Sequence, residues 1–172
     1  MSDKILDEIK TRLKQAEDYW QENYQRGVED KEFVTVEGAQ WGLHEVQKRK
    51  DDGKPSLEFN MCRAYCRQQI NTQRQNRPQA KVVPVDNGAD ADKANLIEGL
   101  IKDTEEATDA ESAYDTAAEN AVYGGIGFYR LVTDYVSDTS FNQEPKFMPV
   151  QNPHAVYIDP LSRALDGSDM TW

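Results

Sequence analysis

The order of helical and extended segments constrains the fold of this chain most. As far as Gly124-Gly125 the apolar residues recur at helical spacings, whereas residues 126–136 and 146–150 are typical of strands. Helices that come first and strands that follow favour an α+β fold. We therefore expect four or more helices packed on a small, mainly antiparallel sheet.

The first helix is expected over residues 2–26, with Gly27 ending it. Its apolar residues form one stripe: Ile5, Ile9, Leu13, Ala16, Trp20 and Tyr24. A helix with one apolar stripe needs a partner, which could be the same chain or another subunit. We treat residues 1–30 as an N-terminal amphipathic helix and residues 31–172 as the α+β region.

The remaining elements follow from periodicity and from turn residues. Further helices are expected over residues 43–50, 60–75 and 90–104. The pattern Thr108-x-x-Glu111 matches a capping box, so another helix is expected to start at Asp109. Short strands are expected over residues 81–85 and 155–158.

The net charge of −11 restricts the partners of the chain, because 31 acidic residues oppose 20 basic ones. Proteins that grip nucleic acid by neutralising phosphates need a surplus of Lys and Arg on one face. This surface therefore disfavours tight sequence-independent DNA binding but suits DNA that slides past. No stretch reaches the roughly 18 apolar residues that span a bilayer, so we expect no membrane contact.

Two motifs invite a functional reading and have simpler structural explanations. Phosphate-binding loops run strand, glycine turn, helix, whereas Gly124-Gly125-Ile126-Gly127 follows a helix and precedes a strand. A helix C-cap with a tight turn is the favoured interpretation.

Residues Asp159, Asp166 and Asp169 could bind a divalent ion, but their spacing lacks the pattern of a calcium loop. A solvated turn is favoured there.

Cys62 and Cys66, with His44 and His154, could in principle hold zinc. The favoured interpretation places both cysteines on a buried helix face with other apolar residues, namely Met61, Tyr65 and Ile70. No catalytic triad or Gly-x-Ser-x-Gly motif is recognisable, and we expect no cofactor and no metal.

One charge pattern stands out on the helix over residues 60–75. Four arginines fall within about 80 degrees if the helix stays regular: Arg63, Arg67, Arg74 and Arg77. Their partner could be carboxylates of the same chain, a neighbouring subunit or DNA, and a protein contact is favoured because Ile70 shares the sector.

Five segments in order resemble the portal proteins of tailed double-stranded DNA phages, most closely those of short-tailed phages. They are Gly38-Ala39-Gln40-Trp41 with Lys48-Arg49, Pro55 to Asn60, Arg74 to Pro78 with the following residues to Pro84, Ala117 to Tyr129, and Asn152-Pro153 to Asp159-Pro160 with Asp166 to Asp169. The Asn76-Arg77-Pro78 turn and the helix-to-strand step at Gly125-Ile126-Gly127 carry most of the resemblance.

The resemblance implies a non-enzymatic subunit of a ring, usually a dodecamer, at one vertex of the virion capsid. Such rings pass DNA during packaging and ejection. They associate with the terminase large subunit, head-completion and tail proteins, scaffold protein and coat protein, and they assemble in the host cytoplasm. Family members are several times longer, so we expect this chain to be an N-terminal part that belongs to the wing region. The alternatives are another acidic interaction module, such as a head-completion adaptor, and a small hydrolase.

Overall fold

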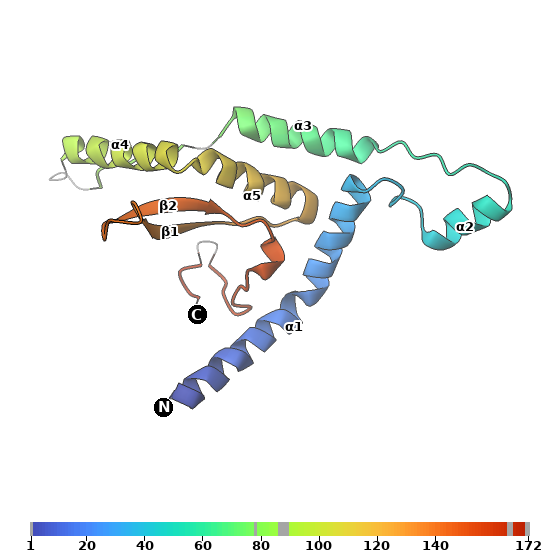
Figure 1. The fold of residues 1–172 in the computed structure, drawn as a ribbon, viewed down its shortest axis with the longest axis horizontal. Coiled ribbons are helices and arrows are strands. Elements are labelled where there is room, and N and C mark those ends of the chain that lie inside the picture. Colours follow the sequence, from blue (N-terminus) through green and yellow to red (C-terminus); the bar gives the residue numbers. More distant parts are fainter. Residues whose placement is uncertain (1, 78, 86–89, 165–166, 171–172) are drawn as a thin grey trace. The chain divides into compact units, whose positions relative to one another are not determined.

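The computed structural model describes residues 2–77, 79–85, 90–164 and 167–170. Two compact units are present, Met1–Asn60 with Asn152–Trp172, and Met61–Gln151. The first unit contains α1 (Ser2–Thr35), α2 (Leu43–Asp51) and the 3-10 helix η1 (Pro153–Ala155) (Figure 1). The second unit contains α3 (Met61–Gln75), α4 (Ala91–Ala107), α5 (Ala110–Gly124), β1 (Tyr129–Tyr135) and β2 (Gln143–Pro149). The expected α+β fold is confirmed.

The second unit is a layer of helices on a β-hairpin. Strands β1 and β2 pair antiparallel, in a register that runs from Tyr129 opposite Pro149 to Tyr135 opposite Gln143. Helix α5 contacts both strands and also α3 and α4 (Figure 1). Small side chains allow this close packing, since Ala110 and Ala113 on α5 are buried.

The glycines between α5 and β1 serve the turn, as the sequence predicts. Gly125 lies in the left-handed region at φ 85° and caps the end of α5. Gly127 is needed for another reason, because a Cβ there would lie 1.9 Å from the carbonyl oxygen of Ala117. The backbone after the helix therefore folds back against α5 more closely than any side chain permits.

The expected capping box at the start of α5 is wrong. The Thr108 hydroxyl donates to the carbonyl of Thr104 at 2.7 Å, and so it closes the end of α4 instead of opening α5. Asp109 then adopts a left-handed conformation at φ 51° and makes no side-chain cap. The capping box does not form because α4 and α5 meet at Thr108, and the Thr108 hydroxyl bonds to the last turn of α4 instead.

Helix α1 is longer than predicted, because it continues past Gly27 to Thr35. A glycine inside a helix costs only about 1 kcal/mol, which tertiary contacts can offset. Gly27 is buried, and Val34 near the helix end is buried as well. The amide nitrogen of Asn60 also donates to the carbonyl of Val34 at 2.8 Å.

The second half of the α1 stripe packs against the C-terminal segment of its own unit. Trp20 Nε1 donates to the carbonyl of Ile158 at 3.1 Å, and the Tyr24 hydroxyl donates to the carbonyl of Val156 at 2.6 Å. The predicted strand over residues 155–158 is therefore wrong, since these carbonyls accept from side chains of α1. The first half of the stripe stays exposed at Ile5 and Ile9.

The predicted strand over residues 81–85 is also wrong, because these residues are irregular. Pro84 has no N–H for a sheet, and the N–H of Val82 donates to the carboxylate of Glu98 on α4. The hydrogen bond and the charge of Lys102 hold the pKa of Glu98 below its ordinary value, and the bond from Val82 adds to this effect. Pro78 and Asp166 lie outside the described residues.

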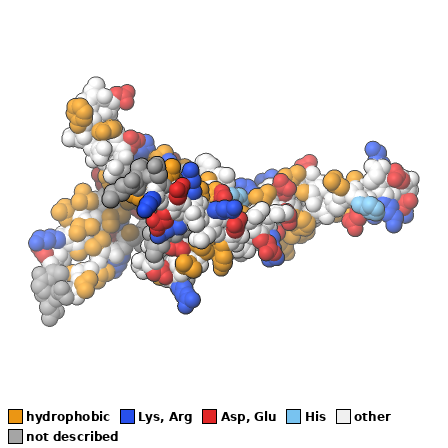
Figure 2. All heavy atoms as spheres, turned by 90° about the horizontal axis from the view of Figure 1, so that it is seen from below, with side chains coloured by type: hydrophobic (Ala, Val, Ile, Leu, Met, Phe, Trp, Pro, Cys, Tyr) orange, Lys and Arg blue, Asp and Glu red, His pale blue; other side chains and the backbone are white. Residues whose placement is uncertain are grey.

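The predicted buried face of the two cysteines is wrong within this chain. Cys62, Met61 and Tyr65 are exposed, and only Ile70 of that set is buried. Many other large apolar side chains reach the surface, where Figure 2 shows hydrophobic patches beside charged groups. No helix among the described residues is both long enough and apolar enough to cross a bilayer.

Replacing Gly127 by Ala tests the close approach after α5. We expect Gly127→Ala to lower the free energy of unfolding by about 3 kcal/mol, because the obstacle is backbone that cannot move aside. Gly99→Ala is the matched control, because Gly99 lies inside α4 with nothing within 4 Å of the added Cβ. It should stabilise the protein by about 0.5–1 kcal/mol. Equal effects of the two substitutions in urea denaturation would contradict this account.

Candidate functional site

The four predicted arginines do not share one environment. Arg63 is half-buried and Arg67 is exposed on the first turns of α3. Arg74 lies in the last turn, and Arg77 lies beyond the helix end at Gln75, so the regular stripe assumed in the prediction stops before it. The structure brings Arg74 and Arg77 together at one carboxylate of α5.

Asp115 is the centre of this cluster. Arg74 Nε lies 3.1 Å and Arg77 Nη2 lies 3.0 Å from the same oxygen of Asp115. Arg77 Nη1 pairs with Glu111 at 2.5 Å, whereas the Arg74–Glu119 pair is longer, at 3.9 Å. The Asp115 side chain is only 21% exposed, so its two pairs are screened less than ordinary surface pairs.

The carboxylates of this cluster were missed at the sequence level, although they leave a signal. Glu111, Asp115 and Glu119 recur every four residues and so lie on one face of α5. A row of acidic residues on one helix and two arginines near the end of another indicate complementary faces. Which carboxylate meets which arginine depends on how α3 packs on α5.

The ion pairs raise the pKa of the Arg77 guanidinium above its ordinary value. The hydrogen bond to Glu111 is the largest cause, and the charge of Asp115 adds to it. By their distances, Arg74 and Arg77 are both paired with carboxylates of the same chain. The cluster braces α3 against α5, and it leaves these two guanidinium groups poorly suited to bind phosphate.

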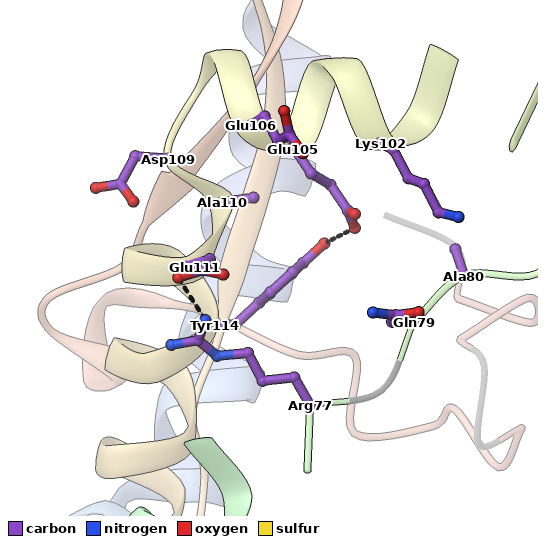
Figure 3. Close-up of a pocket in the computed structure, with 10 residues that line it drawn as sticks. All are labelled: Arg77, Gln79, Ala80, Lys102, Glu105, Glu106, Asp109, Ala110, Glu111 and Tyr114. Carbon is purple, nitrogen blue, oxygen red and sulfur yellow. Dashed lines mark hydrogen bonds and ion pairs between the residues drawn. The ribbon is translucent and has the colours of Figure 1, made fainter. Parts of the chain in front are cut away.

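A cavity of about 410 Å³ lies beside Arg77, at the junction of α4 and α5. We call it the acidic pocket. Its ten lining residues include four carboxylates and two basic side chains (Figure 3): Arg77, Gln79, Ala80, Lys102, Glu105, Glu106, Asp109, Ala110, Glu111 and Tyr114.

Tyr114 lines the acidic pocket and also contacts the hairpin. Its hydroxyl donates to Glu105 Oε1 at 2.8 Å, as Figure 3 shows. Its ring meets Tyr129 of β1 and Phe147 of β2 edge-on, with centroid distances of 5.0 Å and 5.6 Å. Burial and the hydrogen bond to Glu105 raise the pKa of Tyr114 far above the ordinary value of 10.0.

The other candidate sites from the sequence are not assembled in the described part of the chain. The two cysteines are free, and no group of three His, Cys, Asp or Glu side chains that could hold a metal occurs among the described residues. Asp159 accepts from the N–H of Leu161. Asp169 accepts from the Ser162 hydroxyl and the N–H of Arg163, which lower its pKa in that order. Both carboxylates stabilise turns.

The fold is α+β, and the charged groups of this site pair with one another and brace helices α3 and α5. The family model of phage P22-like portal proteins matches residues 10–172, nearly the whole chain. The chain belongs to this family of phage portal proteins. It is 30% identical over 154 residues to a portal protein of Acyrthosiphon pisum secondary endosymbiont phage 1. That alignment covers 84% of this chain and 21% of the relative, so the chain spans about a fifth of the relative's length.

Asp115→Asn tests the brace between α3 and α5. It removes the charge that two arginines share, and we expect the midpoint of thermal unfolding to fall by about 2–5 °C. Glu119→Gln is the matched control, because its single pair is long and its side chain is 48% exposed. It should change the midpoint by less than about 1 °C. Equal shifts in calorimetry would contradict the central place of Asp115.

Tyr114→Phe tests the buried hydroxyl through pH. Because the folded-state pKa of Tyr114 is raised above 10.0, its contribution to stability is complete below pH 10 and is lost as pH rises further. Above pH 10 the free energy of unfolding of the unmodified protein should therefore fall more steeply than that of Tyr114→Phe. Urea denaturation between pH 8 and about pH 11.5 measures the difference. Parallel curves would show that the hydroxyl ionises freely.

Proposed function

We propose that this chain is a structural part of the portal ring at the unique vertex of a phage capsid. In this proposal the ring passes double-stranded DNA during packaging and ejection without sequence specificity, and the chain contributes to the outer wing. The observation that carries the proposal is membership of the portal family over residues 10–172.

The surface of the chain supports a role inside a larger assembly. Among the described residues no bulky side chain is fully buried, and large aliphatic side chains are exposed on both units, for example Ile9 on α1 and Leu96 on α4. Apolar surface of this extent is typical of proteins that bury it against partners. A ring subunit has neighbours on two sides that can cover such surface.

The charge of the chain supports passage of DNA better than DNA binding. The net charge of −11 repels phosphates, and two of the arginines that could have attracted them are paired with carboxylates. A ring that conducts DNA benefits from subunits with weak attraction for DNA, because each phosphate contact adds a barrier to movement.

The proposed partners follow from the family. They are further copies of the protein, the terminase large subunit that drives packaging, head-completion and tail proteins, and scaffold and coat protein during assembly in the host cytoplasm. Since the family is structural, the proposal assigns no catalytic residue to this chain.

Electron microscopy of the full-length portal protein that carries this sequence tests the proposal. We expect closed rings, because members of a portal assembly must surround the DNA. The 172-residue chain alone should sediment as a monomer or a weak, concentration-dependent oligomer, since it spans only part of the length of its relative. A full-length protein that stays strictly monomeric at every concentration would refute the ring.

A further inference from the structure

Residues 36–60 of the first unit form a self-closed arm around α2, which we call the α2 arm. Trp41 Nε1 donates to the carbonyl of Leu57 at 3.2 Å, and Arg49 Nη2 donates to the carbonyl of Pro55 at 2.8 Å. The guanidinium of Arg49 also lies 4.7 Å from the centre of the Trp41 ring. These bonds fix the path of the arm and bury none of the residues of α2.

Several large apolar side chains of the α2 arm lack a cover among the described residues. Leu43 is 91% exposed, and Phe59 and Leu57 are 80% and 65% exposed. A nine-residue helix is marginal in water unless packing supports it, so this exposure indicates a docking element. Figure 2 shows basic, acidic and hydrophobic side chains mixed along this part of the protein.

Leu43 and Lys50 share one side of α2, because they are seven residues apart. Lys50 is exposed, and within the described residues it forms no ion pair. An apolar side chain and an unpaired cation therefore lie on the same side of α2. We call this side the Leu43–Lys50 seam. Lys48 is also exposed and lies well away from this seam, because two residues turn a helix by about 200 degrees.

The acidic pocket of the second unit has the complementary character. Its basic groups are already engaged, since Lys102 pairs with Glu98 at 3.0 Å and Arg77 pairs with Glu111. Glu106 and Asp109 form no ion pair among the described residues, although Asp109 accepts from the Ser112 hydroxyl at 2.6 Å, and Ala80 and Ala110 add apolar lining. The pocket thus offers carboxylates to a cation and apolar wall to an aliphatic side chain.

We infer that the Leu43–Lys50 seam of one copy docks in the acidic pocket of a second copy. This inference rests on the proposed ring. A ring needs two different faces on each subunit that fit each other head to tail, and one chain carries both faces here. Charge complementarity selects the second copy as the occupant, with Lys50 directed to Glu106 and Asp109.

Charge reversal in the full-length portal protein tests the docking. Lys50→Glu should raise the concentration for half-assembly at least about tenfold in sedimentation velocity, because two carboxylates would then face a third. Lys48→Glu, with the same change of charge on the same helix, should assemble like the unmodified protein. The pair Glu106→Lys with Asp109→Lys should fail as Lys50→Glu does.

Mixing the two defective proteins separates docking between copies from contact within one copy. In a mixture each reversed arm can meet a reversed pocket on a neighbour, so rings that alternate the two proteins should form under the electron microscope. No recovery on mixing would overturn the inference, and so would full assembly of Lys50→Glu or equal losses from Lys48→Glu and Lys50→Glu. These results would leave the proposed function standing if the unmodified protein forms rings, whereas its failure to do so would refute the ring itself.

Discussion

Helix α5 is the element on which the second unit depends, because it meets every other helix and strand of that unit. Its alanines let the neighbours approach, and the Ala117 carbonyl comes so close to the following backbone that only Gly127 fits there. One face carries Asp115, which pairs with Arg74 in the last turn of α3 and with Arg77 just after that helix. Tyr114 joins the helix to the hairpin through two ring contacts. One short helix therefore combines close backbone packing, ion pairing and aromatic contacts.

The first unit is held by a different device. Aromatic side chains of α1 donate hydrogen bonds to backbone carbonyls of a segment more than a hundred residues later in the chain. Each bond pairs polar groups that are partly buried, and the segment is held to α1 in this way without strand pairing. The rings of Tyr24 and His154 meet at 5.1 Å and close this contact. A few hydrogen bonds and one ring contact therefore hold the C-terminal segment to α1, with little buried apolar surface.

The small core and the exposed apolar surface fit membership of a portal family, whose members work in an assembly. A chain that leaves Leu43, Phe59 and Leu96 in water gains stability when neighbours cover them. The acidic surface has a separate effect on DNA, because its negative charge opposes tight binding of DNA. The proposed assembly through apolar and charged contacts is therefore compatible with the proposed weak attraction for DNA.

The sequence by itself determined the helices with strong periodicity, the glycine turn after α5, the antiparallel hairpin and the acidic balance. These features depend on neighbours in the chain, whose spacing is visible in the residues. Tertiary structure decided that α1 runs through Gly27, that Thr108 closes α4, and that residues 81–85 and 155–158 bond to side chains instead of forming strands. It also decided which carboxylates meet Arg74 and Arg77, and it left Cys62 exposed. The reason is physical: local propensities differ by about 1 kcal/mol, and a single long-range hydrogen bond or packing contact is large enough to reverse them.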